Sequence, residues 1–522
     1  MSVAERHEHD VLVIGAGGAG LRAVIAAEQA GASVGVVCKS LLGKAHTVMA
    51  EGGIAAALGT MRTEDGWRVH FRDTMRGGKG LNDWRMARIH AEEAPDRVKE
   101  LEAWGALFDR TEEGRILQRP FGGHTYDRLA HVGDRTGLEM LRTLQDRAVH
   151  AGVDVYMECT VIALLRGDGR VAGALGYWRD TGEFVLFRAK SVVLATGGAG
   201  QAWKINTNSW EYTGDGLHMA HRAGADLLGM EFVQFHPTGM VWPPSVRGTL
   251  VTEGVRGEGG VLRNSEGERF MFRNAPETFQ GDYAEDEAEA AAWAAGDHVN
   301  NRPPPELLTR DVVARAILKE VEQGRGSPHG GVFLDIASQR SPEYIRKKLP
   351  GMHHQFGELA DVDITVDPME VGPTTHYMMG GVKVDPETAE TTLPGLFAAG
   401  EVAAGLHGGN RLGGNSLSDL LVFGERAGAS AAERAEALEG PAPIDEAEVR
   451  SLVEWATSPF DAADEGNPFA LHEELQELMQ AKVGIARTEE EMTEAIEHVA
   501  ELRRRLEGVG LSGSPAYHPG WN

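Results

Sequence analysis

A short apolar strand pattern that runs directly into a glycine-rich turn is the feature that most restricts the fold of this chain. Residues 11–14 read Val-Leu-Val-Ile, a β-branched run typical of a buried strand. Gly15, Gly17 and Gly20 follow with the spacing G-x-G-x-x-G, and Gly18 lies between them. Such a turn lets the backbone approach a pyrophosphate and packs the next helix on the sheet. The sequence therefore predicts a dinucleotide-binding unit at its N-terminal end.

The residues after the turn continue this unit but alter one expected contact. The pattern predicts a helix over 21–30, whose first N–H groups would face the phosphates, and a second strand over 33–37. The usual fingerprint has an acidic residue for the ribose about twenty residues further on. Here that place is taken by Lys39 and Ser40, which become candidate cofactor contacts. The site therefore gives no basis for assigning NAD.

A histidine lies downstream of the glycine turn, in the run 44–53 that reads Lys-Ala-His-Thr-Val-Met-Ala-Glu-Gly-Gly. With this run, the chain resembles the flavoprotein subunits of succinate dehydrogenases and fumarate reductases, in which such a histidine carries FAD covalently. The resemblance implies FAD as the cofactor, attached at His46. It also implies that Thr47, Gly52 and Gly53 contact the cofactor.

Later motifs support an FAD domain. A strand predicted over 191–194 leads into a Thr-Gly-Gly turn, and a second strand is predicted over 395–401. A helix is predicted over 415–432, and its N-terminus would favour negative charge on a reduced flavin. The candidate cofactor residues in these motifs are Thr196, Gly197, Gly198, Asp215, Glu401, Ser416 and Leu417.

The resemblance implies an α/β fold with a glutathione-reductase-type, Rossmann-like FAD-binding domain. This domain is expected over 1–230 and 353–438, with an inserted α+β capping domain over 231–352. A helical C-terminal domain over 439–522 looks truncated relative to the family, and residues 496–507 have a helical pattern within it. The acidic stretch over 280–297 is predicted to be a solvated helix or loop.

The charge and cysteine content restrict the partners. The chain has 51 Lys and Arg against 78 Asp and Glu, a net charge of −27, which argues against nucleic acid. The N-terminal segment 1–10 has no secretory apolar region, and no run approaches the roughly 20 apolar residues of a membrane span, so we expect a cytoplasmic protein. Cys38 and Cys159 are too few for a disulfide framework or a four-thiolate cluster, and no metal site is expected. A partner must therefore relay single electrons.

The resemblance implies two protein partners, an iron–sulfur subunit and a membrane anchor. An iron–sulfur subunit would exchange electrons with the flavin and, through a membrane anchor, with quinone. The chain would then lie peripherally on the inner face of the cell membrane.

The resemblance also assigns roles around a dicarboxylate substrate, succinate or fumarate. Arg310 resembles the proton donor and acceptor, and Glu253 and Arg256 resemble the relay that serves it. Arginine suits a carboxylate clamp because its planar fork donates two parallel hydrogen bonds and keeps its charge. The clamp residues by resemblance are His236, Thr252, His376 and Arg411, with Phe121 packed against substrate and flavin.

Two other functions remain open from the sequence. The first is an L-aspartate oxidase-like flavoenzyme, which has similar clamp motifs but ordinarily lacks the linking histidine, so His46 argues against it. The second is a non-catalytic flavin-holding subunit. The residues assigned to chemistry all precede Asn415, which favours an enzyme.

Overall fold

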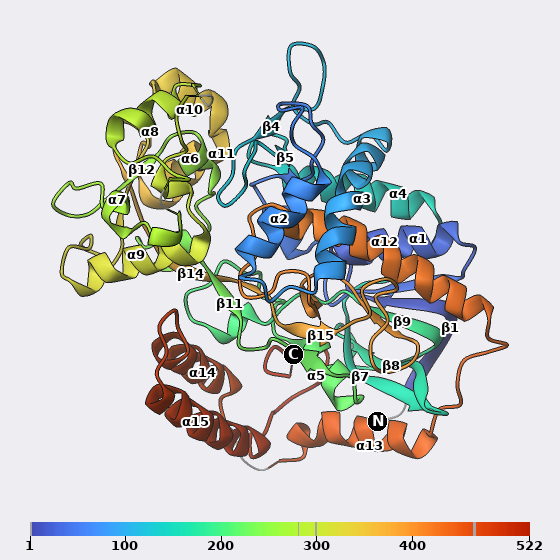
Figure 1. Cartoon of the computed structure of the whole chain (residues 1–522). Coiled ribbons are helices and arrows are strands. Elements are labelled where there is room, and N and C mark those ends of the chain that lie inside the picture. Colours follow the sequence, from blue (N-terminus) through green and yellow to red (C-terminus); the bar gives the residue numbers. More distant parts are fainter. Residues whose placement is uncertain (1–2, 280, 298–299, 463–465, 522) are drawn as a thin grey trace.

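The fold is a mixed α/β arrangement in which a large sheet and its helices carry a second body of smaller elements (Figure 1). It comes from a computed structural model that describes residues 3–279, 281–297, 300–462 and 466–521. A large apolar core lies where α1 (Gly18–Gln29) and α12 (Asn415–Glu436) cover the main sheet. The second body has an apolar core of its own.

The main sheet contains the strand that precedes the glycine turn. Within the described residues it has seven strands, in the order β6-β2-β1-β9-β8-β7, and β16 lies alongside β9. β1 is parallel to β2 and β9, whereas β7, β8 and β9 form an antiparallel meander. The strand predicted over 33–37 is present to within one residue as β2. Strands β1 and β9 end at the predicted residues, 14 and 194, but β1 begins eight residues and β9 seven residues earlier than predicted, because the two strands pair along their whole length. Strand β16 lies within the one predicted over 395–401. The bounds are β1 (Val3–Ile14), β2 (Val34–Val37), β6 (Asp154–Tyr156), β7 (Cys159–Gly167), β8 (Arg170–Trp178), β9 (Phe184–Leu194) and β16 (Leu396–Ala398).

Helices α1 and α12 approach each other closely on the main sheet because small residues line their contact. A Cβ at Gly424 would lie 2.8 Å from the Ala19 carbonyl oxygen, and one at Gly428 would lie 2.1 Å from that of Ala23. α1 begins three residues earlier than predicted, directly after the turn that follows β1. α12 begins at the predicted residue, Asn415.

The second body is built on an antiparallel sheet in the order β11-β14-β13-β12. Helix α9 packs against β11 and β14. The boundary expected at 352 falls inside α11, and β14 lies beyond it, so this sheet takes in a strand from the part assigned to the FAD domain. The bounds are β11 (Val233–Met240), β12 (Val261–Arg263), β13 (Val332–Asp335), β14 (Met369–Met378), α6 (Gly254–Gly257), α7 (Met271–Asn274), α8 (Glu287–Ala294), α9 (Arg310–Glu322), α10 (Pro342–Lys348) and α11 (Pro350–Ala360).

The described part of the predicted acidic stretch includes α8, which buries Ala290 and Trp293. The C-terminal region ends in two packed helices, α14 and α15, and the helix predicted over 496–507 lies within α15. None of the described helices is long and apolar enough to cross a membrane. The remaining elements are α2 (Trp67–Gly77), α3 (Trp84–Ala103), α4 (Thr136–His150), α5 (Asp215–Arg222), α13 (Glu446–Thr457), α14 (Pro468–Lys482), α15 (Glu489–Glu507), β3 (Ile54–Ala55), β4 (Gln118–Arg119), β5 (Leu129–Ala130), β10 (Leu227–Leu228), β15 (Gly381–Lys383) and β17 (Ala403–Ala404).

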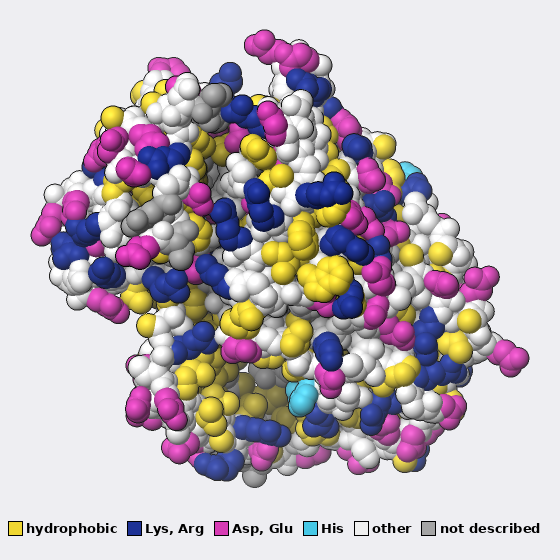
Figure 2. Space-filling view, in the orientation of Figure 1, with side chains coloured by type: hydrophobic (Ala, Val, Ile, Leu, Met, Phe, Trp, Pro, Cys, Tyr) yellow, Lys and Arg dark blue, Asp and Glu magenta, His cyan; other side chains and the backbone are white. Residues whose placement is uncertain are grey.

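The surface charge is uneven despite the net charge of −27. On the face in Figure 2, Lys and Arg side chains gather over α2 and α3, where Arg68, Arg72 and Arg85 are exposed. Acidic side chains are spread over the rest of that face. The net negative charge therefore does not describe the local charge over α2 and α3.

Candidate active site

A cavity between the carboxyl end of β1 and the second body collects most of the predicted site residues. Those that do not line it are Gly20 and Gly198, which pack directly behind the lining, and Arg256, which lies behind Glu253. The predicted residues that line it are Gly15, Gly17, Gly18, Lys39, Ser40, His46, Thr47, Gly52, Gly53, Phe121, Thr196, Gly197, Asp215, His236, Thr252, Glu253, Arg310, His376, Glu401, Arg411, Ser416 and Leu417.

The glycine turn forms a cradle that only glycine permits at two positions. Gly15 has φ +109°, and a Cβ there would lie 2.3 Å from the Ala195 carbonyl oxygen. A Cβ at Gly20 would lie 1.9 Å from the Gly15 carbonyl oxygen. Gly17 is the N-cap of α1 and supplies no side-chain cap; the Gly18 N–H donates to Thr47, and the positive end of the helix still faces the cavity, where it favours a phosphate. The turn therefore fits a dinucleotide such as FAD.

The residues at the ribose position form an ion pair of their own. Lys39 Nζ donates to Asp215 Oδ2 at 2.6 Å and to Thr213 Oγ1 at 3.0 Å. Two candidate cofactor residues, 176 positions apart, thus meet at one end of the cavity. Lysine occupies the place where the usual fingerprint has a carboxylate, and its partner Asp215 is the first residue of α5.

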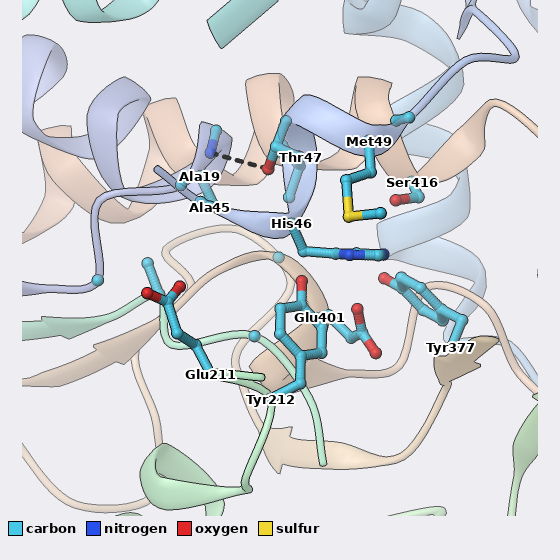
Figure 3. Close-up of a pocket in the computed structure, with 18 of the residues that line it drawn as sticks. Ala19, Ala45, His46, Thr47, Met49, Glu211, Tyr212, Tyr377, Glu401 and Ser416 are labelled. Atoms are coloured by element: carbon cyan, nitrogen blue, oxygen red, sulfur yellow. Dashed lines mark hydrogen bonds between the residues drawn. The ribbon is translucent and has the colours of Figure 1, made fainter. Parts of the chain in front are cut away.

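His46 lies across the middle of the cavity (Figure 3). Its ring is 4.9 Å from that of Tyr212, and its Nδ1 is buried with no hydrogen-bond partner in the described residues. Thr47 fixes this segment, because its Oγ1 accepts a hydrogen bond from the Gly18 N–H at 3.2 Å, the dashed line in Figure 3. Burial, together with the charge of Arg411, lowers the pKa of His46 to about 4. The ring is therefore neutral at physiological pH, as a nucleophilic nitrogen must be.

Glu401 lies beside the same stretch of the cavity. Its Oε1 accepts a hydrogen bond from the Met378 N–H at 3.0 Å, and burial raises its pKa to about 8. A carboxyl with this pKa is largely protonated at neutral pH and can donate a hydrogen bond to a hydroxyl or carbonyl oxygen. This suits a contact with the polar chain of FAD.

Strands β11 and β14 place two histidines at the other end of the cavity. His236 is buried and His376 is partly buried, and their ring centroids lie 5.0 Å apart. Nδ1 of His376 lies 2.7 Å from Thr207 Oγ1, and Nδ1 of His236 accepts a hydrogen bond from the Thr238 N–H at 3.2 Å, so each neutral ring can carry its proton on Nε2. In the described residues no hydrogen bond uses either Nε2. Burial and the charge of Arg310 hold both pKa values well below the usual range, so both rings are neutral.

Arg411 comes from the loop before α12 and faces the same end. Its Nε is buried without a hydrogen-bond partner in the described residues, and its guanidinium carbon lies 4.3 Å from the centre of the Tyr377 ring. Burial and the charge of Arg310 lower the pKa of Arg411 to about 10, so it remains charged at neutral pH. Thr252 and Phe121 are also buried there and line the cavity. A buried cation that forms no ion pair with the described residues, beside two neutral histidines, fits a carboxylate ligand.

Arg310, the first residue of α9, forms an ion pair with Glu253. Its Nε donates to Glu253 Oε2 at 2.9 Å, and Arg256 Nη2 lies 3.6 Å from the same oxygen. The Gly122 N–H donates to Glu253 Oε1 at 2.7 Å. Burial alone would raise the pKa of Glu253, but the charges of Arg310 and Arg256 outweigh burial and lower it. The carboxylate is therefore ionised between two guanidinium groups.

Two side chains that the sequence reasoning did not assign contact these arginines. Gln234, on β11, accepts hydrogen bonds from both Arg310 and Arg411. Tyr377, on β14, supports the Arg411 guanidinium. Gln234 lies two residues before His236 and Tyr377 directly follows His376, but neither an amide nor a phenol marks a site by itself.

Buried histidines also support the start of α12, and no sequence motif marks them. His70 Nε2 lies 2.9 Å from Asn415 Oδ1, His90 Nε2 2.8 Å from Ser418 Oγ, and His124 Nε2 2.7 Å from the Gly413 carbonyl oxygen. Burial lowers the pKa of His90 to about 3 and that of His124 to about 4. These contacts hold the loop that carries Arg411 and the helix start that lines the cavity.

The cavity thus joins a dinucleotide cradle to a cationic end. This arrangement can hold a small dianion against a redox cofactor and can move a proton through Arg310 and Glu253. The described residues contain no group of three or more His, Cys, Asp or Glu that could hold a metal. The cysteines Cys38 and Cys159 are free and buried.

Comparisons with known proteins agree with this architecture. An FAD binding domain model matches residues 10–417, and a fumarate reductase flavoprotein C-terminal model matches 472–518. A fumarate reductase (CoM/CoB) subunit from Methanothermobacter marburgensis is 46% identical, over 96% of this chain and 86% of that protein. A succinate dehydrogenase flavoprotein subunit from Rickettsia bellii is 39% identical, over 97% of this chain and 83% of that protein.

Solved structures give the same result. A chain of Mycobacterium smegmatis Sdh1 in complex with UQ1 is 57% identical with a TM-score of 0.84, over 99% of this chain and 84% of that chain. A chain of an E. coli quinol fumarate reductase variant is 35% identical with a TM-score of 0.89, over 99% of this chain and 86% of that chain.

Proposed function

This chain belongs to the family of succinate dehydrogenase and fumarate reductase flavoprotein subunits, and from that premise we propose how its site works. The chain is an FAD-dependent oxidoreductase that interconverts succinate and fumarate. The observation that carries this conclusion is the junction, in one cavity, of the glycine cradle with the cationic end formed by Arg310 and Arg411. A dianion held there by paired charges lies next to the redox cofactor.

We assign the clamp on the substrate to four side chains from both bodies of the protein. Arg411 binds one carboxylate through its unpaired Nε, and the Nε2 atoms of His236 and His376, whose Nδ1 atoms can accept from the Thr238 N–H and the Thr207 hydroxyl, donate to carboxylate oxygens. Thr252 lies beside them, and Phe121 packs over the substrate and excludes water. Holding both carboxylates fixes the substrate carbons, and such positioning contributes about 7–11 kcal/mol to catalysis in favourable cases.

We assign proton transfer to Arg310. Its Nε and Nη1 are engaged by Glu253 and Gln234, and in the described residues no hydrogen bond uses Nη2. Nη2 is therefore the atom that gives a proton to the substrate carbon or takes one from it. Glu253 Oε2 exchanges a proton with Arg310 along the 2.9 Å hydrogen bond, and Arg256 connects that carboxylate with the interior of the second body.

When FAD is bound, it supplies the two-electron chemistry by accepting or returning a hydride. The residues that would hold it are the glycine cradle, the Lys39–Asp215 pair, Glu401 and the start of α12. We further propose that this FAD domain is of the glutathione-reductase type and that the flavin is linked covalently to His46. The buried, neutral and unpaired Nδ1 of that ring supports the linkage.

We propose that electrons leave through a separate iron–sulfur subunit. Two buried cysteines cannot hold a cluster, and the relatives named above include a quinol fumarate reductase. On this account the chain is peripheral on the inner face of the cell membrane, attached through the iron–sulfur protein and a membrane anchor.

Steady-state assays in both directions test the activity. The purified holoprotein should reduce an artificial dye with succinate and oxidise a reduced viologen dye with fumarate, and malonate should inhibit both. L-aspartate should give no hydrogen peroxide. Activity with aspartate but not with succinate would replace this proposal by an aspartate oxidase.

A further inference from the structure

The amide of Gln234 lies between the two arginines that the mechanism separates by role. Gln234 is only 3% exposed. Its Oε1 accepts a hydrogen bond from Arg310 Nη1 at 3.1 Å and another from Arg411 Nη2 at 3.1 Å. Its Nε2 donates to Asn410 Oδ1 at 2.8 Å and to the Arg411 carbonyl oxygen at 2.7 Å.

This network fixes which way the amide points. A glutamine side chain has two donor hydrogens and two acceptor lone pairs on its oxygen, and each of the four has a partner here. The reverse orientation would place the NH2 group against two guanidinium groups and the oxygen against two acceptors. The amide therefore presents its oxygen to Arg310 and Arg411 in one defined geometry.

We propose that Gln234 is a positioning residue that sets the distance between the proton donor Arg310 and the clamp residue Arg411. This inference rests on the proposed function. The clamp fixes a carboxylate, and the donor must reach a carbon only two bonds away from it. Since a displacement of about 1 Å can cost about 100-fold in rate, the separation of the two guanidinium groups controls turnover.

The other contacts of Arg310 and Arg411 do not fix the distance between the two guanidinium groups. Arg310 is otherwise hydrogen-bonded to Glu253, and Arg411 is otherwise supported by the face of Tyr377. Neither of these contacts joins the two arginines. In the described part of the chain, Gln234 is the side chain whose hydrogen bonds reach both, and it joins β11 to the loop before α12.

A neutral amide is also the right chemistry at this point. Its oxygen bridges two like charges without cancelling them, so the cationic field that attracts a dianion persists. A carboxylate would neutralise part of that field, would oppose the substrate carboxylate and would compete with Glu253 for Arg310.

Two substitutions separate these effects. Gln234→Asn keeps the amide but shortens the side chain by one methylene, so the amide oxygen no longer reaches both guanidinium groups. We expect kcat to fall at least 30-fold while the malonate Kd changes less than fivefold. Gln234→Glu keeps the shape but adds a charge, so the succinate KM and the malonate Kd should both rise at least tenfold. The matched control is Gln118→Leu, which removes an equally buried amide whose hydrogen bonds, among the described residues, go to two backbone carbonyls and Thr60. It should lower the melting temperature and leave kcat and KM unchanged.

The outcomes distinguish a failure of the role assigned to Gln234 from a failure of the proposed function. Wild-type kcat and KM in both Gln234 variants, or activity lost only in proportion to bound FAD, would overturn the role of Gln234 and leave the proposed function intact. A wild-type holoprotein inactive with both succinate and fumarate would instead overturn the proposed function, and this inference with it.

Discussion

Replacing Arg310 by lysine separates proton transfer from substrate binding. Arg310 makes two side-chain hydrogen bonds, to Glu253 at 2.9 Å and to Gln234 at 3.1 Å, and keeps Nη2 for the substrate. A lysine preserves the charge but has a single side-chain nitrogen, which cannot contact Glu253, Gln234 and the substrate carbon in the geometry that the three arginine nitrogens provide. Losing a charge-assisted hydrogen bond costs about 1.5–3 kcal/mol, and a misplaced general acid costs about 100- to 10,000-fold. We therefore expect Arg310→Lys to lower kcat about 1000-fold, which is about 4 kcal/mol in the barrier.

Binding should survive the same substitution. The clamp residue Arg411 keeps its own contacts, so the Kd of malonate, measured by calorimetry on the holoprotein, should change less than fivefold. Arg315→Lys, on the exposed side of α9, is the matched control and should behave as wild type. If Arg310→Lys kept near-normal turnover, another group would move the proton and the relay assigned here would be wrong.

The other predictions concern the relay, the flavin link, the partner and pH. Glu253→Gln keeps a hydrogen-bond acceptor but loses the charge, so kcat should fall about 10- to 100-fold, less than in Arg310→Lys, in the same dye assay. Protein matured with its assembly factors should retain flavin after acid precipitation. The folded His46→Ser variant should still bind FAD but release it on acid precipitation, and it should lose succinate oxidation more than fumarate reduction. The isolated chain should reduce dyes but not a membrane quinone, and robust quinone reduction by it would refute the need for an iron–sulfur partner. His90 and His124 have lowered pKa values, so the folded protein excludes protons that the unfolded chain binds below about pH 6.5; these two histidines alone should lower stability by about 3 kcal/mol from pH 7.5 to 5.5, and His90→Gln should remove about half of that contribution in melting curves.

The local sequence pattern was sufficient for the elements around the cofactor. The apolar run before Gly15 and the helical spacing after Asn415 predicted β1 and α12, because each pattern reflects burial on one element. The boundary at 352 could not be placed in the same way. Strand β14 returns to its sheet from beyond α11, and such long-range pairing leaves no local signal.

The site residues fall into the same two groups: those that a local sequence run predicts and those whose role depends on distant parts of the chain. Residues in distinctive runs, such as His46 and Arg411, line the cavity together. Gln234 and His70 were not assigned, because their roles depend on which loop or helix start lies opposite them in space. A buried amide or histidine carries the same sequence signal whether it supports a core or a site.

The most direct test of the central claim is an anaerobic titration of the purified holoprotein with succinate, followed by the flavin absorption spectrum. Succinate should bleach the oxidised flavin, fumarate should restore it, and prior addition of malonate should prevent the change. A flavin that stays oxidised in excess succinate yet bleaches fully with dithionite would contradict the claim that this cavity interconverts succinate and fumarate.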